Sequence, residues 1–390
     1  MMRTSHKWII LTLSFAAILV GACAPVTDLK DQQTSAVSLT LVEPTAAPDF
    51  ARAVDVQEFS FPQDHGPHFE YQTEWWYYTG NLQTEDGQRF GYQFTIFRRA
   101  LAPGEPPEGD GLATNQIYFA HVALTDVAGE SHFFDERFSR GAADLAGAQA
   151  DPFAAWVEDW RVESEGIEAD QVLIVAEGQD FELDLTLEAI KPIVRHGQDG
   201  LSAKSDEVGN ASYYLSFTRI QTVGDLRIGD RTYEVSGLSW FDHEWSTSVL
   251  DENAVGWDWF GLQLDDGREL MLYFIRLADG EIDPISGGTF IGKQGEVIGL
   301  EASEVQIEAL DTWLSEQSGT EYPSGWRINL PTLDMELTVE PLIEAQEMRV
   351  SFTYWEGAVR IRGEQDGVPF GGSGYVELTG YLESMEGVLS

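Results

Sequence analysis

The stretch FELDLTLE, residues 181–188, alternates apolar and polar side chains without a break. A period of two sends successive side chains to opposite faces of a β-strand, so this segment predicts a strand with one buried and one solvated face. Strand signals dominate after residue 70, while residues 301–317 fit either a helix or a strand. Asp-Gly pairs, which favour tight hairpin turns, recur at 86–87, 199–200, 266–267, 279–280 and 366–367. The sequence predicts an all-β chain of antiparallel strands.

Two segments of the chain share one pattern. EWWYYTGNLQTEDG (74–87) and WDWFGLQLDDG (257–267) each contain a Trp, a Gly four residues later and an Asp-Gly turn. Each continues into a strand that ends in an arginine, Arg98 or Arg276. Such an internal echo indicates two related β domains, and chance similarity between two aromatic hairpins is the alternative. We expect two β-barrel or sandwich domains in tandem, residues 58–250 and 251–390, which meet near residues 245–255.

The first residues follow the pattern of a bacterial targeting segment. After a basic start, the apolar run from Trp8 to Val20 has 13 residues, too few to cross a bilayer comfortably. The run ends at a segment that resembles a bacterial lipobox, and its Cys23 is the only cysteine of the chain. We expect a lipoprotein signal peptide at residues 1–22, a lipid on Cys23, and a flexible tether at residues 23–57. A plain secretory signal with an incidental cysteine is the alternative.

The charge of the chain excludes one class of partner. The chain of 390 residues has 66 Asp and Glu but only 23 Lys and Arg, which gives a formal net charge of −43. Nucleic acid is excluded because phosphate binding needs cationic side chains. The same charge repels anionic lipid head groups, so attachment to a membrane is expected to depend on the lipid anchor. We predict an extracytoplasmic protein, lipid-anchored to a bacterial membrane, and the sequence leaves its oligomeric state open.

The stretch LSWFDHEWSTS (238–248) places titratable side chains between aromatic ones. On a strand, Asp242 and Glu244 face one side, and His243 faces the other side together with Trp245. Burial among aromatic rings lowers the pKa of an imidazole and keeps it a neutral base near pH 7. The alternative is a histidine that is hydrogen-bonded in a domain interface, with the two carboxylates at a solvated edge.

Two further carboxyl groups lie beside tryptophans. Asp258 stands between Trp257 and Trp259, and Glu74 precedes Trp75 and Trp76. A carboxyl group in aromatic surroundings keeps its proton to higher pH and can act as a general acid. For both residues the alternative is a water-facing position on a strand whose tryptophans pack in the core.

The segment DHGPHFE (64–70) contains several side chains of the types that bind metal ions. His65 and His68 are metal-ligand types, and Asp64 or Glu70 could complete a set. The Gly-Pro pair between the histidines favours a turn that holds a loop, and no other metal-ligand spacing supports the idea. We predict no metal and no cofactor.

Four aromatic blocks, in order, resemble the carotenoid 1,2-hydratase (hydroxyneurosporene synthase) and AttH-like family. They are PQDHGPHFEYQTEWWYYTGNL (62–82), GLSWFDHEWS (237–246), GWDWFGLQL (256–264) and YWEGAVRIRG with GGSGYVELTGY (354–381). The resemblance implies two lipocalin-like β-barrels and apolar, often polyene or terpenoid, substrates. In hydratase members a His and a Trp two residues later are implicated in catalysis, and His243 and Trp245 match that spacing. A Tyr and an Asp are also implicated there, whereas here Asp258 follows Trp257.

Apolar walls with a few acidic and basic groups suit chemistry on a hydrocarbon. We expect a hydratase-type lyase, or a related proton-initiated isomerase or cyclase, acting on an apolar small molecule. Asp258 is predicted to protonate a double bond, His243 to take a proton from water, Asp242 to orient the groups, and Trp245 to stabilise the cation. The predicted substrate-binding residues are Trp257, Trp259, Trp240, Trp76, Tyr78 and Glu74.

Three other functions remain open at this point. A non-catalytic lipocalin-like carrier of hydrophobic ligands needs the aromatic walls but not the acid and the base. It becomes the better interpretation if His243 and Asp258 lie far from any common pocket. An assembly lipoprotein predicts an exposed apolar patch in place of a deep pocket. A secreted serine hydrolase is disfavoured because GLSWF (237–241) lacks the second glycine of a nucleophile elbow.

Overall fold

The computed structural model describes residues 49–107, 111–164, 169–247, 250 and 253–385. The predicted signal peptide, the lipidation residue Cys23 and most of the predicted tether lie outside these residues. Among the described residues, no helix is long and apolar enough to cross a membrane. The described part is all-β, as predicted, with three short 3-10 turns: η1 (Gln63–His65), η2 (Ala302–Glu304) and η3 (Pro331–Leu333).

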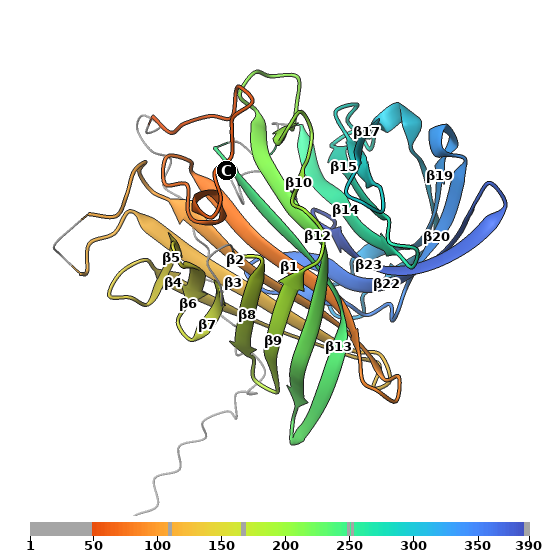
Figure 1. Ribbon diagram of the computed structural model, residues 1–390, viewed down its shortest axis with the longest axis horizontal. Helices are drawn as coiled ribbons and strands as arrows, with labels where there is room; N and C mark the ends of the chain where they lie inside the picture. The colour runs from red at the N-terminus through yellow and green to blue at the C-terminus, as the bar shows by residue number, and fades with distance from the viewer. Residues whose placement is uncertain (1–48, 108–110, 165–168, 248–249, 251–252, 386–390) are drawn as a thin grey trace, which may run out of the picture. The chain divides into compact units, whose positions relative to one another are not determined.

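The first sheet curls into a nearly closed barrel (Figure 1). Its main path runs in the order β4-β3-β2-β1-β13-β12-β9-β8-β7-β6-β5, with β10 and β11 paired to β12. Its strands are β1 (Thr73–Gln83), β2 (Arg89–Ala100), β3 (Gln116–Asp126), β4 (Ser131–Arg140), β5 (Ala146–Ala150), β6 (Phe153–Val157), β7 (Trp160–Ser164), β8 (Gln171–Glu177), β9 (Phe181–Ala189), β10 (Val194–Arg195), β11 (Leu201–Ala203), β12 (Ala211–Ile228) and β13 (Arg231–Ser246). The alternating stretch 181–188 is β9, with its four apolar side chains buried in the barrel.

The second sheet forms a half-barrel in the order β17-β16-β15-β14-β23-β22-β20-β19-β18, with β21 paired to β22. Its strands are β14 (Ala254–Leu264), β15 (Glu269–Leu277), β16 (Gly287–Ile291), β17 (Val297–Glu301), β18 (Gln306–Leu314), β19 (Glu321–Leu330), β20 (Met335–Pro341), β21 (Glu347–Arg349), β22 (Thr353–Gln365) and β23 (Val368–Leu378). The ambiguous residues 301–317 contain η2 and β18. Two lipocalin-like sheets in tandem confirm the predicted fold class.

The two sheets repeat one pairing scheme. In the first sheet β1 pairs with β2 and with the last strand, β13. In the second sheet β14 pairs with β15 and with the last strand, β23. The two strands of the sequence echo, β1 and β14, therefore hold equivalent places. The chain leaves the first sheet at Ser246 and enters the second sheet at Ala254. Both sheets belong to one compact unit.

Each sheet buries its own apolar core, and a third cluster lies between the sheets. Trp76 belongs to the core of the first barrel, while its neighbour Tyr77 belongs to the cluster between the sheets. In the same way, Phe260 belongs to the core of the second sheet, and its neighbour Trp259 belongs to the cluster between the sheets. Strand alternation thus gives β1 and β14 two buried faces, one inside a barrel and one between the sheets.

The end of the predicted tether is in contact with the first sheet. Ala53 is buried, and the backbone nitrogen of Ala51 donates a hydrogen bond to the carbonyl of Glu70 at 2.9 Å. The hydroxyl of Tyr213 donates to the carbonyl of Asp55 at 2.8 Å. These backbone contacts make residues 51–55 part of the folded body.

Candidate functional site

A cavity of about 80 Å³ lies between the two sheets. Its walls are mostly aromatic and come from both sheets; they include Trp75, Tyr77, Tyr214, Trp257, Trp259 and Tyr273. Four carboxyl groups also line it: Asp242, Glu244, Glu356 and Glu377. The volume suffices for several water molecules or for one apolar segment of a larger ligand. Apolar walls with a few converging polar groups are typical of a ligand site.

Two of these carboxyl groups face each other across a strand pair. Glu356 of β22 is the direct cross-strand partner of Glu377 of β23. Two negative charges in such positions repel each other, and burial in the cavity adds a desolvation cost. Burial and the neighbouring Glu377 raise the pKa of Glu356 well above its usual value, although Tyr77 donates a hydrogen bond to it. The pair therefore holds at least one proton near pH 7.

Glu377 has the properties of a general acid. Burial and the charges of Asp242 and Glu244 raise its pKa to about 8, against a smaller opposing effect of the hydrogen bond from Trp257. The indole Nε1 of Trp257 donates this hydrogen bond to Glu377 Oε2 at 3.1 Å. A carboxyl group that is protonated at neutral pH and has a free oxygen can donate its proton to a ligand.

Asp242 is held by several donors and organises one wall of the cavity. Its carboxylate accepts hydrogen bonds from the Tyr214 hydroxyl at 2.6 Å, from the Trp240 indole at 2.6 Å and from the Ser216 hydroxyl. The Trp259 indole in turn donates to the Tyr214 oxygen at 2.9 Å. Burial raises the pKa of Asp242 to about 7, and these hydrogen bonds limit the rise. Asp242 thus fixes the ring orientations of Tyr214 and Trp259.

Glu244 supplies a negative charge to the same wall. The Lys204 ammonium lies 2.6 Å from its carboxylate, and both side chains are largely buried. The ammonium also lies 5.4 Å from the ring centroids of Tyr214 and Tyr273. The two opposite charges compensate each other in this buried position, and the aromatic faces stabilise the cation.

His243 does not line this cavity, which corrects the prediction of a base in the cleft. Its ring points into the first barrel, where it lies 5.1 Å from the Trp76 ring and 4.7 Å from the Trp245 ring. Alternation along β13 sends Asp242 and Glu244 to the cavity and His243 to the opposite face, as the strand pattern predicted. Burial lowers the pKa of His243, despite a hydrogen bond to Glu74 that raises it.

Asp258 also lies away from the cavity, so the expected cleft shared by Asp258 and His243 is not formed. Asp258 points into the half-barrel, where the Arg276 Nε lies 3.0 Å from its carboxylate. The Tyr381 hydroxyl donates to both carboxylate oxygens at 3.0 and 3.1 Å. Burial raises the pKa of Asp258, although Arg276 and Tyr381 oppose the rise. The pKa values of Asp258 and His243 shift in the predicted directions, but the two side chains face separate cores.

The other predicted residues divide between the two faces of their strands. Trp257 and Trp259 line the cavity, and Trp240 packs edge-on against Trp259 with ring centroids 6.0 Å apart. Trp76 and Tyr78 belong to the core of the first barrel. Trp245 packs beside Tyr213 and Ala53, and Glu74 is bonded inside the first barrel. Trp76, Tyr78 and Glu74, predicted to bind substrate, and Trp245, predicted to stabilise the cation, do not line this cavity. Their strand neighbours Trp75, Tyr77 and Glu244 do.

Sequence reasoning missed Glu356 and Glu377. Both stand inside the aromatic blocks that carry the family resemblance, in YWEG and YVEL, each among apolar residues. A single acidic residue in an apolar strand segment is a detectable signal of a buried carboxyl group. Their direct opposition depends on the register of β22 and β23, which the sequence does not display.

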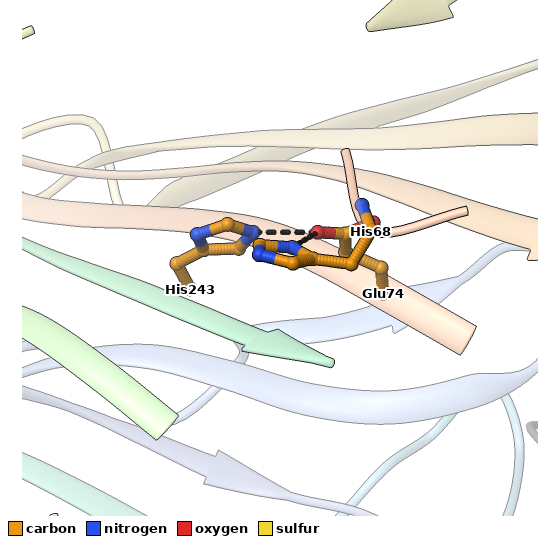
Figure 2. A group of neighbouring side chains, drawn as sticks. All are labelled: His68, Glu74 and His243. Carbon is orange, nitrogen blue, oxygen red and sulfur yellow. Dashed lines mark hydrogen bonds and ion pairs between the residues drawn. The ribbon is translucent and has the colours of Figure 1, made fainter. Parts of the chain in front are cut away.

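Three side chains in the first barrel have the types and proximity of a metal site. His68, Glu74 and His243 place their ligand atoms within 4.8 Å of one another, as Figure 2 shows. Glu74 Oε1 lies 2.7 Å from His68 Nδ1 and 2.8 Å from His243 Nε2. These are hydrogen-bond lengths, whereas ligands at about 2.0 Å around tetrahedral zinc lie ~3.3 Å apart. As placed, the group is a hydrogen-bonded cluster.

The same cluster contains a buried ion pair. Arg98 Nε lies 2.8 Å from the second oxygen of Glu74, and Asp64 lies 3.3 Å from His68 Nε2. Burial alone would raise the pKa of Glu74, but the charges of Arg98 and His68 hold it well below its usual value. Among the described residues the predicted set around His65 and His68 is not assembled: the His65 ring packs against Phe61 and Phe217, with ring centroids 4.6 and 5.7 Å apart. Glu74 and Arg98 are direct cross-strand partners on β1 and β2, whereas Asp258 and Arg276 lie diagonally on β14 and β15.

Comparisons with known proteins agree with this architecture. The AttH-like family model matches residues 52–381. The chain is similar to the crystal structure of an AttH protein from Nitrosomonas europaea, with 32% identity and a TM-score of 0.76 over 85% of this chain and 100% of that one.

A second solved structure shares the fold at lower sequence similarity. It is kievitone hydratase from Nectria haematococca, with 13% identity and a TM-score of 0.65 over 86% of this chain and 99% of that one. No curated protein matches the chain. The family match covers most of the chain, and the chain therefore belongs to the AttH-like family.

Proposed function

We propose that this protein is a hydratase-type lyase that acts on an apolar substrate in the cavity between the sheets, with Glu377 as the acid. The observation that carries the proposal is the Glu356–Glu377 pair, which keeps a proton at neutral pH among aromatic walls. Because of this raised pKa the carboxyl group still carries its proton at neutral pH, so that among apolar walls it can serve as the general acid that protonates a double bond.

The proposed reaction adds water without a co-reactant. Glu377 gives its proton to one carbon of the double bond, and the π electron pair forms the new C–H bond. The other carbon becomes a cation, which the faces of Trp257 and Trp259 and the charge of Glu244 stabilise. A water oxygen forms the C–O bond, and the Glu377 carboxylate takes the excess proton from that oxygen. This last transfer restores the acid for the next cycle.

The family and one structural relative support the choice of reaction. Kievitone hydratase, by its name, adds water to an organic substrate, and it shares the two-sheet fold. The resemblance to carotenoid 1,2-hydratases favours a polyene or terpenoid-like substrate. A cavity of about 80 Å³ accommodates one segment of such a molecule, so we propose that the double bond enters the cavity while the rest of the chain stays outside.

A carrier is the second candidate, and one observation favours it. His243 and Asp258 face different cores, which is the arrangement expected of a carrier. The lyase stays the first candidate because Glu377 offers an acid that does not depend on that pair. A carrier uses the same aromatic walls but has no need of a protonated Glu377. Turnover that depends on Glu377 therefore separates the two functions.

The proposed acid predicts a defined dependence on pH. Because burial and nearby charges raise the pKa of Glu377 to about 8, the carboxyl group is protonated and active below that pH. We expect kcat/KM to fall as the pH rises through about 8, ten-fold for each further pH unit. Steady-state rates across the neutral and alkaline range test this, and a profile that stays flat through this interval contradicts it.

We also propose that the protein is lipid-anchored outside the cytoplasm through Cys23. The lipobox-like segment supports the anchor, and the net charge of −43 excludes electrostatic binding to anionic lipid as a substitute. Cys23→Ser is expected to move the protein from the membrane to the soluble extracytoplasmic fraction. Fractionation followed by immunoblotting measures this shift, and unchanged membrane retention of the variant would refute the anchor.

A further inference from the structure

The most buried part of the cavity contains a carboxyl oxygen without a protein partner. Glu356 is 0% exposed and lines the cavity. Its Oε2 accepts a hydrogen bond from the Tyr77 hydroxyl at 2.9 Å, whereas its Oε1 meets no hydrogen-bond partner among the described residues. Buried polar atoms in folded proteins are almost always hydrogen-bonded, because leaving one unpaired is costly. An unpaired oxygen at a cavity wall therefore indicates a position for a polar ligand atom.

A second unpaired group lies on the adjacent strand. The hydroxyl of Tyr375 is buried and also has no hydrogen-bond partner among the described residues. Tyr375 precedes Glu377 by two residues on β23, so both side chains point to the same face as Glu356. Tyr375 pairs with Ala358, two residues beyond Glu356 on β22, and burial together with the charge of Glu356 raises the pKa of Tyr375. The two unpaired atoms thus lie on one face of the β22–β23 pair, and Glu356 is the one of the two residues that lines the cavity.

The protonation of Glu356 determines what this region can bind. Burial and Glu377 keep Glu356 protonated, and its Oε2 already accepts the hydrogen bond from Tyr77. The acidic hydrogen is therefore available on Oε1, where a hydroxyl or carbonyl oxygen of a ligand can accept it. A neutral ligand oxygen fits this position, because the one cation that lines the cavity among the described residues, Lys204, is already paired with Glu244.

We propose that the substrate is an oxygenated apolar molecule, a neutral terpenoid-like alcohol or ketone, whose oxygen is bound by Glu356 in the buried part of the cavity. The inference rests on the proposed function for the identity of the site, and it narrows the substrate from hydrocarbons in general to this class. A bound oxygen would also set the position of the double bond relative to Glu377, since Glu356 and Glu377 are direct cross-strand partners.

A matched pair of ligands tests the proposal without turnover. Geraniol and 2,6-dimethylocta-2,6-diene share one carbon skeleton and differ only in the hydroxyl group. Their binding to the full chain can be followed by the fluorescence of the cavity residues Trp75, Trp257 and Trp259. We expect the wild-type protein to bind the alcohol about 10-fold more tightly than the hydrocarbon. In Glu356→Leu the preference should disappear through weaker binding of the alcohol, while the hydrocarbon binds at least as well.

Control variants separate this contact from general damage to the fold. Glu364→Leu changes an exposed glutamate of the same strand and should keep the preference for the alcohol. Glu356→Gln keeps the shape and a hydrogen-bond donor, and it should retain most of the preference even if Glu356→Leu fails to fold.

The results that would contradict the proposal can be told apart from one another. Equal affinities of the wild-type protein for the two compounds, or binding of neither, would overturn the proposal and assign the unpaired oxygen to bound water. A preference that persists in Glu356→Leu would remove Glu356 from the contact. If only Glu377 variants lose activity, that result bears on the proposed reaction and not on the contact between Glu356 and the ligand oxygen. The preference for the alcohol is measured by binding, without turnover. Conversely, an alcohol preference in a protein without turnover supports an oxygenated ligand for a carrier.

Discussion

Glu377→Gln is expected to lower turnover at least about 100-fold while ligand affinity stays unchanged. The amide keeps the size of the side chain and can accept the Trp257 hydrogen bond, but it has no proton acidic enough for a double bond. The aromatic walls that bind the substrate remain intact. Incubation with terpenoid and lipid extracts in ¹⁸O-labelled water, followed by mass spectrometry, detects the hydrated product and gives the rate for each variant.

The control for this variant is Glu364→Gln, which makes the same chemical change at an exposed position of β22. It should hydrate at the wild-type rate. If Glu377→Gln incorporates labelled oxygen as fast as the wild-type protein, Glu377 is not the acid. If neither the wild-type protein nor Glu377→Gln incorporates the label although both bind the ligand, the carrier function is the correct one.

Glu74→Leu is expected to reduce the free energy of unfolding by about 3–5 kcal/mol. Glu74 is fully buried and receives hydrogen bonds from His68, His243 and Arg98. Removal of its carboxylate leaves the Arg98 guanidinium in the core without its counter-charge, and a buried unpaired charge is far costlier than a lost contact. Urea unfolding followed by tryptophan fluorescence measures the change.

The neighbouring Glu70→Leu serves as the control, because Glu70 is exposed and should change stability little. The pH dependence provides an independent check on Glu74. Its pKa in the folded protein lies well below the ordinary value of 4.5, so its contribution is present above that pH and is lost as the pH falls toward the folded pKa. The stability difference between wild type and Glu74→Leu should therefore shrink in acid, and a constant difference would exclude this ion pair as the cause.

The separation of the predicted acid from the predicted base shows where the sequence pattern stops being informative. Alternation along residues 238–248 placed Asp242 and Glu244 on one face and His243 on the other, and the structure has this arrangement. The error lay in choosing which face is the site. In most antiparallel sheets one face meets the core and the other meets water, so the apolar face identifies the interior. Here residues 239–246 of β13 are buried on both faces.

The sequence by itself determined the all-β class and the tandem arrangement of two sheets, because these depend on local periodicity and on patterns repeated along the chain. Only the tertiary structure decided that one face of β13 and β14 lines a barrel and the other lines the cavity between the sheets. It alone placed Glu356 opposite Glu377, since strand register joins residues that are 21 positions apart in the sequence. The pKa values of such a pair arise from burial and proximity in space, which no linear pattern of residues records.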